Sequence, residues 1–187
     1  PVHPGANALA IAQNRLKEKT YLSDNGFPVA PFAHVKTEAE FKEAAASIGT
    51  PSVLKTSGFG YDGKGQIKLN NQDDIDKAWN LLASDDAVIE KWISYKDEVS
   101  IIAARNIHGE FKCYPLIHNT HRNHILDVSF FPASVQAKTQ QQAEEIAKVL
   151  LSKLEYVGLL CIEFFRMDDD SLLINEIAPR THNSGHV

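Results

Sequence analysis

Residues suited to hold a phosphate chain stand close together in the first half of the sequence. Lys55 ends a short apolar stretch, and residues 57–65, which follow, read Ser-Gly-Phe-Gly-Tyr-Asp-Gly-Lys-Gly. Glycines let backbone N–H groups approach phosphate oxygens, and Lys55 and Lys64 add compact positive charge. The run has neither the Gly-Lys-Ser/Thr ending of a P-loop nor the helix that follows a dinucleotide fingerprint. It therefore predicts a loop that covers phosphates or, on this feature alone, an ordinary hairpin loop.

Two carboxylates stand inside apolar stretches near the end of the sequence. Glu163 lies in residues 159–165, and Glu176 lies in residues 172–177. Burying a carboxylate is costly unless a cation accompanies it. On neighbouring antiparallel strands the two acids could share one Mg²⁺, with Asn175 adding a neutral oxygen. The alternative is that both acids lie on a solvated sheet face.

The segment 175–186 is rich in side chains that form hydrogen bonds. Arg180 could clamp a phosphate or a carboxylate through two parallel hydrogen bonds, and His182 and Asn183 could orient a small anion. A plain surface loop is the alternative. The density of polar side chains directly after a buried strand favours a functional loop.

A histidine cluster comprises His118, His121 and His124, with Arg122 among them. Three histidines suggest zinc, but the spacing matches no usual zinc site and no cysteine or acid completes it. The pattern favours a polar loop, with contact to phosphate or substrate as the other interpretation.

Residues 90–93, Glu-Lys-Trp-Ile, are followed by Glu98. An extended segment beside a hinge can offer backbone groups to an adenine edge, and an acid farther on can hold ribose hydroxyls. Taken alone, the segment is equally typical of an edge strand.

These residues depend on alternating strands and helices for their positions. Thr37 and Glu40 have the spacing of a capping box, and Gly26 is placed to stop a helix. We expect helices over 8–25, 37–48, from Asn71 or Asp73 onward, and over 139–154. We expect strands over 32–35, 51–55, 66–69, 87–92, 98–105, 111–115, 158–165 and 172–177. The order indicates an α+β fold: a small mixed sheet with two helices, a hinge near residues 93–94, and an antiparallel sheet with a covering helix.

Composition limits the class of protein. The chain has 187 residues and a formal net charge of −5, which argues against a broad electrostatic grip on nucleic acid. Two cysteines predict no disulfide framework and favour a reducing, cytoplasmic setting. No stretch has the apolar length of a membrane span. The first residues resemble no signal peptide and include no initiating methionine, so we expect a fragment of a longer protein.

Taken in order, five segments resemble the ATP-grasp superfamily and, within it, the N5-carboxyaminoimidazole ribonucleotide synthetases. The resemblance covers nearly the whole chain, and its last segment is the most specific. The five segments are 13–15 (Gln-Asn-Arg), 53–56 (Val-Leu-Lys-Thr), 60–66 (Gly-Tyr-Asp-Gly-Lys-Gly-Gln), 90–93 and 175–186. Two positions depart from the family pattern: Thr181 replaces the usual proline, and Val187 the usual tryptophan.

The resemblance implies a role for each matching position. Phosphate contacts are implied for Arg15 and Lys55, adenine contacts for Glu90 and the backbone of Lys91 and Ile93, and a ribose contact for Glu98. The nucleotide-binding set as a whole is Arg15, Lys55, Gly60, Tyr61, Asp62, Gly63, Lys64, Gly65, Gln66, Glu90, Lys91, Trp92, Ile93, Glu98, His121, Asn175 and Glu176. The implied magnesium ligands are Glu163, Asn175 and Glu176. Lys55 and Arg180 would act in the reaction, and Arg180, His182 and Asn183 would face the substrates.

The resemblance also implies an architecture and a reaction. Residues 1–35 would lead in from an absent N-terminal domain, 36–94 would form a small subdomain with the flap, and 95–187 a larger one with the metal site, with ATP held between them. The implied reaction is carboxylation of aminoimidazole ribonucleotide by bicarbonate, with ATP and Mg²⁺, in proteins expected to be homodimeric at full length. A sister ligase, such as the formate-dependent glycinamide ribonucleotide transformylase, and a non-catalytic nucleotide-binding module are the alternatives.

Overall fold

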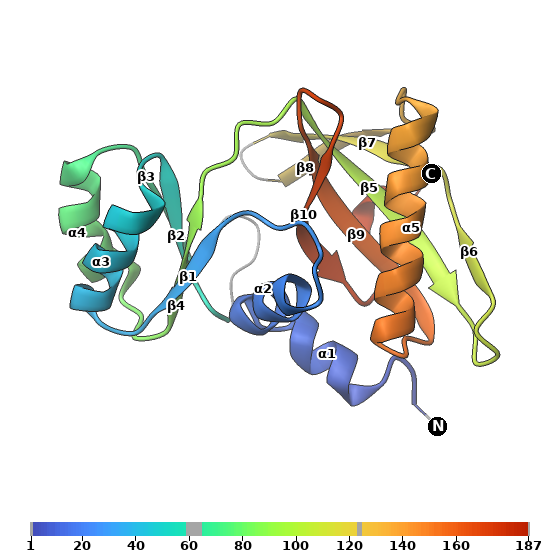
Figure 1. Ribbon diagram of the computed structural model, residues 1–187, viewed down its shortest axis with the longest axis horizontal. Helices are drawn as coiled ribbons and strands as arrows, with labels where there is room; N and C mark the ends of the chain where they lie inside the picture. The colour runs from blue at the N-terminus through green and yellow to red at the C-terminus, as the bar shows by residue number, and fades with distance from the viewer. Residues whose placement is uncertain (1, 59–64, 123–124, 187) are drawn as a thin grey trace.

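Two sheets of unequal size lie side by side in the computed structural model, which describes residues 2–58, 65–122 and 125–186 (Figure 1). All strand pairs within both sheets are antiparallel in the described residues. Helices cover each sheet, so the α+β class expected from the sequence is confirmed. None of the helices in the described part of the chain combines the length and apolarity that a membrane crossing requires.

The smaller sheet has the strand order β1-β4-β2-β3. Its buried face packs on two helices, α3 and α4, in a core that contains Phe41, Leu54 and Ile89. Both helices begin at a side-chain cap: Thr37 accepts the Glu40 amide at 3.2 Å, and Asn71 accepts the Asp74 amide at 3.0 Å. The elements are β1 (Phe32–Val35), α3 (Glu38–Ile48), β2 (Ser52–Thr56), β3 (Gln66–Leu69), α4 (Gln72–Leu82) and β4 (Ala87–Lys91). This sheet therefore begins with β1 at Phe32.

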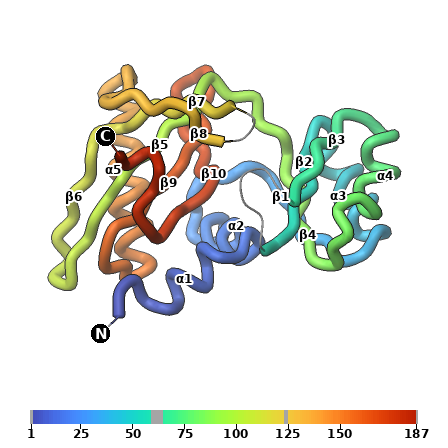
Figure 2. The backbone as a smooth tube through the Cα atoms, turned by 180° about the vertical axis from the view of Figure 1, so that it is seen from behind, coloured from blue at the N-terminus to red at the C-terminus, as the bar shows by residue number. Residues whose placement is uncertain are grey.

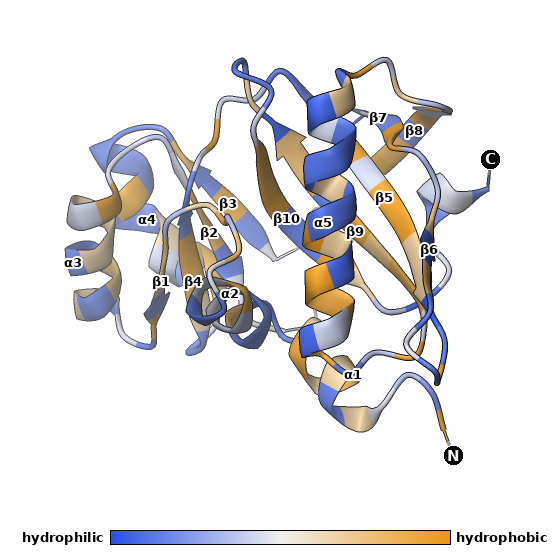
Figure 3. Ribbon diagram, turned by 45° about the vertical axis from the view of Figure 1, so that its right-hand side comes forward, coloured by the Kyte–Doolittle hydropathy of each residue, from blue (hydrophilic) through white to orange (hydrophobic). Residues whose placement is uncertain are grey.

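The larger sheet has the order β10-β9-β5-β7-β8, with β6 also paired to β5. Helix α5 covers one face, and its buried residues Ala143, Ala147, Leu150 and Leu151 recur at the helical period. Hydrophobic and hydrophilic residues alternate along α5 in Figure 3, as expected for a helix with one buried side. The elements are β5 (Asp97–Arg105), β6 (Phe111–Cys113), β7 (Ile117–Arg122), β8 (Ile125–Phe130), α5 (Ala137–Lys153), β9 (Gly158–Arg166) and β10 (Leu172–Ala178).

The expected helix over 8–25 is two helices, α1 (Ala6–Ala12) and α2 (Arg15–Asp24). The single-helix prediction was wrong because Asn14 leaves the helical conformation and caps α2, accepting the Lys17 amide at 2.9 Å. Seen from behind in Figure 2, α2 lies beside β10 and near the smaller sheet. It therefore contacts elements of both sheets.

The polar loop expected through the histidine cluster was also wrong. Residues 117–122 and 125–130 are the strands β7 and β8, which pair with each other, and β7 pairs with β5. Their polar side chains hid the strand pattern, because β8 lies at a sheet edge and is largely exposed. His124 lies outside the described residues.

Candidate nucleotide and metal site

Three cations surround one buried carboxylate where α2 meets the smaller sheet. Glu90 on β4 lies 3.2 Å from Lys55 Nζ, 3.5 Å from Lys19 Nζ and 3.8 Å from Arg15 Nη1. Burial pushes the pKa of Glu90 upward, but the three cations outweigh it and hold the pKa below its usual value. Burial also lowers the pKa of Lys55 to about 8, against the attraction of Glu90. The cluster keeps more positive than negative charge.

A cavity of about 350 Å³ opens beside this cluster. Three residues predicted for the site contribute to its walls: Arg15, Glu176 and Arg180. Arg180 is exposed, and its Nη1 donates to the Thr181 carbonyl oxygen at 2.9 Å. The full lining is Leu9, Ala12, Gln13, Arg15, Glu18, residues 56–58 and residues 176–180.

The acid pair lies directly across neighbouring strands. Glu163 on β9 and Glu176 on β10 are register partners, because a bulge at Asn175 shifts the pairing by one residue. They lie on the sheet face away from α5, since Ile162 and Phe164 occupy the α5 side. Oxygens of both acids and a nitrogen of His182 lie within 4.8 Å of one another. Burial, followed by repulsion from Glu163, raises the pKa of Glu176 above its usual value.

Lys55 and Arg15 act on Glu176 of this acid pair. Attraction to both cations lowers the pKa of Glu176, although burial and Glu163 dominate the shift. The acids therefore do not face bulk water on the far side of the molecule. Arg15 on α2 and Glu176 on β10 line one cavity, and Lys55 on β2 lies close enough to act on Glu176.

A second group of possible cation ligands shares Glu163. Glu98 on β5, His121 on β7 and Glu163 have ligand atoms within 4.8 Å of one another. His121 Nδ1 lies 3.0 Å from Glu98 Oε2, and this contact raises the pKa of His121. Within the described ranges, no such group includes His118, which pairs with Asp97 at 3.6 Å instead.

The predicted flap is described only at its end. Gly60, Tyr61, Asp62, Gly63 and Lys64 lie outside the described residues, whereas Gly65 and Gln66 lie inside them. Gly65 has φ 70°, and a Cβ there would lie 2.8 Å from Thr56 Oγ1. Position 65 therefore requires glycine.

The segment 90–93 joins the two sheets. Its Lys91 amide donates to the Pro31 carbonyl at 2.8 Å and its Trp92 amide to the Pro51 carbonyl at 3.1 Å. Lys68 Nζ lies 3.8 Å from the Trp92 ring centroid. These two amides are thus used within the protein, and the Ile93 backbone follows directly.

His182 and Asn183 point to different places. His182 is buried, and its Nε2 lies 3.0 Å from Glu163 Oε1. Asn183 is exposed and lines a separate cavity of about 380 Å³ with Leu126, Asp127, Ser129 and His186. The segment was predicted to face the substrate as one loop. In the structure His182 contacts the acid pair, whereas Asn183 lines the second cavity.

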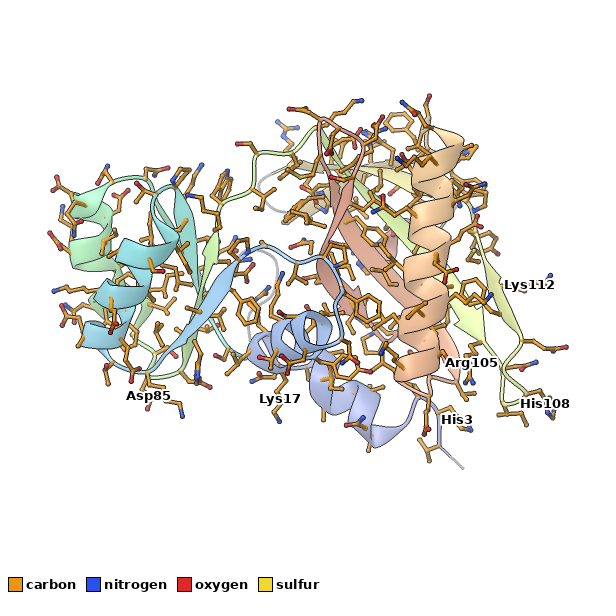
Figure 4. All side chains as sticks on the ribbon, in the orientation of Figure 1. His3, Lys17, Asp85, Arg105, His108 and Lys112 are labelled. Atoms are coloured by element: carbon orange, nitrogen blue, oxygen red, sulfur yellow. The ribbon has the colours of Figure 1, made fainter. Side chains whose placement is uncertain are left out.

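The sequence patterns did not predict two buried charged residues of α2, Glu18 and Lys19. Lys19 Nζ donates to the Asn175 carbonyl at 2.9 Å, and Glu18 Oε2 accepts the Ile177 amide at 3.3 Å. Burial raises the pKa of Glu18 to about 8. Glu18 and Lys19 lie four and three residues before the buried Leu22, so they share its helix face, and this spacing could have indicated that they are buried. Lys17, in contrast, points outward (Figure 4).

Residues 20–187 match the model of the ATP-grasp domain family, and the chain belongs to that family. The N5-carboxyaminoimidazole ribonucleotide synthases of Bacillus subtilis and Pseudomonas aeruginosa are 42% and 45% identical to it, over 97% and 100% of this chain and 48% and 51% of their own lengths. A crystal structure of the Aspergillus clavatus synthase, in complex with ADP and 5-aminoimidazole ribonucleotide, has a TM-score of 0.89 at 30% identity. The match includes 98% of this chain and 48% of the chain in that crystal structure. The chain thus spans about half the length of these relatives.

Proposed function

We propose that this chain is the nucleotide-binding part of an ATP-dependent carboxylase that acts on 5-aminoimidazole ribonucleotide. One observation carries the proposal: Arg15 and Glu176 line the same cavity, and Lys55 and Glu163 both lie close enough to Glu176 to act on its charge. Cations suit the phosphates of ATP, and a carboxylate pair suits the metal ion that accompanies them. The relatives named as synthases support the choice of substrate.

Magnesium fits the donors at the acid pair. Glu163 and Glu176 offer carboxylate oxygens, and Asn175, next to Glu176 in the bulge of β10, would offer an amide oxygen. Burial and then repulsion from Glu163 raise the pKa of Glu176, and a bound cation would offset both by stabilising the ionised carboxylate. When bound, the ion would neutralise charge on the phosphates, while Arg15 and Lys55 hold and orient them.

The proposed reaction has two steps. A bicarbonate oxygen attacks the γ-phosphorus of ATP, the bond to the ADP oxygen breaks, and carboxyphosphate forms. The amine of the ribonucleotide then attacks the carboxyl carbon, phosphate leaves, and the amine loses a proton. Arg180 would hold the anionic reactants near Lys55, and His182 and Asn183 would face bicarbonate and the ribonucleotide. The predicted flap, residues 60–66, is assigned the role of excluding the water that destroys carboxyphosphate, and its residues 60–64 lie outside the described residues.

The remaining role assignments are part of the same proposal. Adenine would lie against Glu90 and the backbone of Lys91 and Ile93, Trp92 would flank it, and the ribose would reach Glu98, with His121 nearby. The domain limits at 35 and 94, the cytoplasmic location and the homodimer of full-length proteins also stay predictions.

Two measurements test the function. Calorimetric titration of this chain with ATP should show weak binding that requires Mg²⁺, and no binding to well-folded protein would contradict the proposal. The full-length gene product should release ADP only when both bicarbonate and aminoimidazole ribonucleotide are present. ADP release stimulated instead by formate and glycinamide ribonucleotide would favour the sister ligase, and binding without turnover would favour a non-catalytic module.

A further inference from the structure

A chain of hydrogen bonds runs through the larger sheet behind Glu163. Glu163 Oε1 lies 3.0 Å from His182 Nε2, and His182 Nδ1 lies 2.9 Å from the hydroxyl oxygen of Ser184. Ser184 Oγ lies 2.9 Å from Ser100 Oγ on β5, which lies 2.9 Å from the side-chain amide of Asn119 on β7. All four residues behind Glu163 are buried, and Ser100 and Ser184 are completely inaccessible.

The sheet register builds this chain. Ser100 is the partner of Glu163 across the pair β5–β9, and Asn119 is the partner of Ser129 across the pair β7–β8. Ser129 donates to Asn119 Oδ1 at 2.9 Å and also lines the cavity that Asn183 borders. The buried chain thus extends from the acid pair to the second cavity.

The backbone decides which nitrogen of His182 carries the proton. The Ser184 amide donates to His182 Nδ1 at 3.3 Å, and the imidazole in this way caps the short 3-10 helix η1 (Asn183–Gly185). A backbone N–H can only donate, so Nδ1 must accept and carries no proton. The neutral ring therefore holds its proton on Nε2, which donates it to Glu163.

The buried side chains point their hydrogens in the same direction. The amide nitrogen of Asn119 can only donate to Ser100, so the Ser100 hydroxyl has its own hydrogen to give to Ser184. The Ser184 hydroxyl, which also lies 3.9 Å from Cys161 Sγ, can then donate to His182 Nδ1. In this arrangement every donor in the chain points toward the acid pair, and each bond reinforces the next.

We infer that Ser184, Ser100 and Asn119 are positioning residues that hold His182 in the Nε2–H form as a hydrogen-bond donor to Glu163. In that form His182 cannot also ligate a cation through Nε2, although its nitrogen lies within 4.8 Å of both acids. The cation is thereby left to Glu163, Glu176 and their oxygen-donating neighbour Asn175. Glu163 keeps its second oxygen for that cation, since His182 occupies the first.

Nitrogen NMR of this chain tests the inference without any activity. Long-range proton–nitrogen spectra of ¹⁵N-labelled protein distinguish protonated from unprotonated ring nitrogens, and the spectrum of His182→Gln identifies the signals of His182. We expect the Nε2–H form, unchanged after Mg²⁺ and ADP are added. An Nδ1–H form, or loss of the Nε2 proton to a bound cation, would overturn the inference.

Variants test the buried chain behind the histidine. Ser100→Ala and Ser184→Ala should broaden the His182 ring signals or mix its two neutral forms, whereas Ser100→Thr, which keeps the hydroxyl, should restore the wild-type spectrum. Ser152→Ala, on the exposed side of α5, is the matched control. Unchanged His182 signals in both alanine variants would refute the positioning role, and the wild-type spectrum still decides the ring form if a variant fails to fold.

A kinetic readout rests on the proposed function. In the full-length gene product, Ser100→Ala should lower kcat by about tenfold and change the KM for ATP by less than about twofold. The reason is that the substitution removes a hydrogen-bond partner that supports a metal ligand from behind. Absence of any carboxylase turnover in the wild type would reject the function and leave the NMR result to decide the inference. A kcat equal to wild type in an active Ser100→Ala enzyme would count against the inference alone.

Discussion

The two sides of the site carry opposite charges and differ in how those charges are satisfied. On the side of the smaller sheet, Lys55, Lys19 and Arg15 already surround Glu90. On the larger sheet, Glu163 and Glu176 face each other across neighbouring strands, and within the described ranges no lysine, arginine or histidine forms an ion pair with Glu176. The cationic half is assembled in advance, whereas among the described residues the acidic half has a direct partner only in His182, at Glu163.

This difference indicates how the site responds to ligands. Repulsion and burial raise the pKa of Glu176, so a divalent cation relieves an existing cost when it binds. Glu90 instead holds the cations in place before any phosphate arrives, and this preorganisation lowers the cost of binding. We therefore expect substitutions in the acidic half to remove the metal dependence and substitutions in the cationic half to weaken phosphate binding.

Glu176→Ala should break the acidic half and have the largest effect. The Mg²⁺-dependent part of nucleotide affinity should fall by about a hundredfold, because a direct carboxylate ligand is lost. Without metal the variant should be at least as stable as the wild type, since repulsion from Glu163 disappears. Calorimetry with and without Mg²⁺ measures the first effect and urea unfolding the second. Glu145→Ala, on the exposed side of α5, is the control, and unchanged nucleotide affinity in Glu176→Ala would remove the metal assignment.

Glu18→Gln tests the surroundings of the acidic half, because Glu18 places a further carboxyl, itself buried, near Glu176. Burial raises the pKa of Glu18 from 4.5 to about 8, so the folded state resists the ionisation that the unfolded chain undergoes. The resulting loss of stability is absent below pH 4.5, grows as the pH rises, and is complete above about pH 8.

Glutamine keeps an acceptor for the Ile177 amide and cannot ionise. The variant should therefore gain roughly 2 kcal/mol of stability at pH 7 and progressively less toward pH 5. Urea unfolding at several pH values measures this gain. A gain that does not depend on pH would show that the Glu18 carboxyl is not the cause.

Lys55→Met should break the cationic half with a smaller effect, because Arg15 and Lys19 remain. Nucleotide affinity should fall by about tenfold at pH 7, in keeping with the loss of one charge-assisted contact. In the wild type, affinity should also fall as the pH rises through about 8, since Lys55 then loses the charge that attracts phosphate. Calorimetry between pH 7 and 9 measures both effects. Lys112→Met, at the far end of the molecule on β6, is the control and should bind nucleotide as the wild type does (Figure 4). If the nucleotide affinity of Lys55→Met depended on pH as strongly as that of the wild type, Lys55 would be excluded as the source of the pH dependence.

Some of the site could be predicted because it depends on local patterns. The apolar stretches around Glu163 and Glu176 indicated neighbouring strands, and the structure pairs these two residues directly. Thr37 and Asn71 cap their helices as their residue types predict. The strands β7 and β8 could not be recognised, since their polar, exposed residues acquire a strand conformation only through pairing that begins at β5.

The sequence by itself determined the class of fold, the caps and breaks of the helices, and which residue types were available for phosphate and metal. The tertiary structure alone decided their partners: Glu90 with three cations, Asn175 as the bulge that aligns the acids, and Ser184 and Ser100 behind His182. The physical reason is distance along the chain. Capping and alternation act over a few residues, whereas ion pairs and register join segments that only packing of the whole domain brings together.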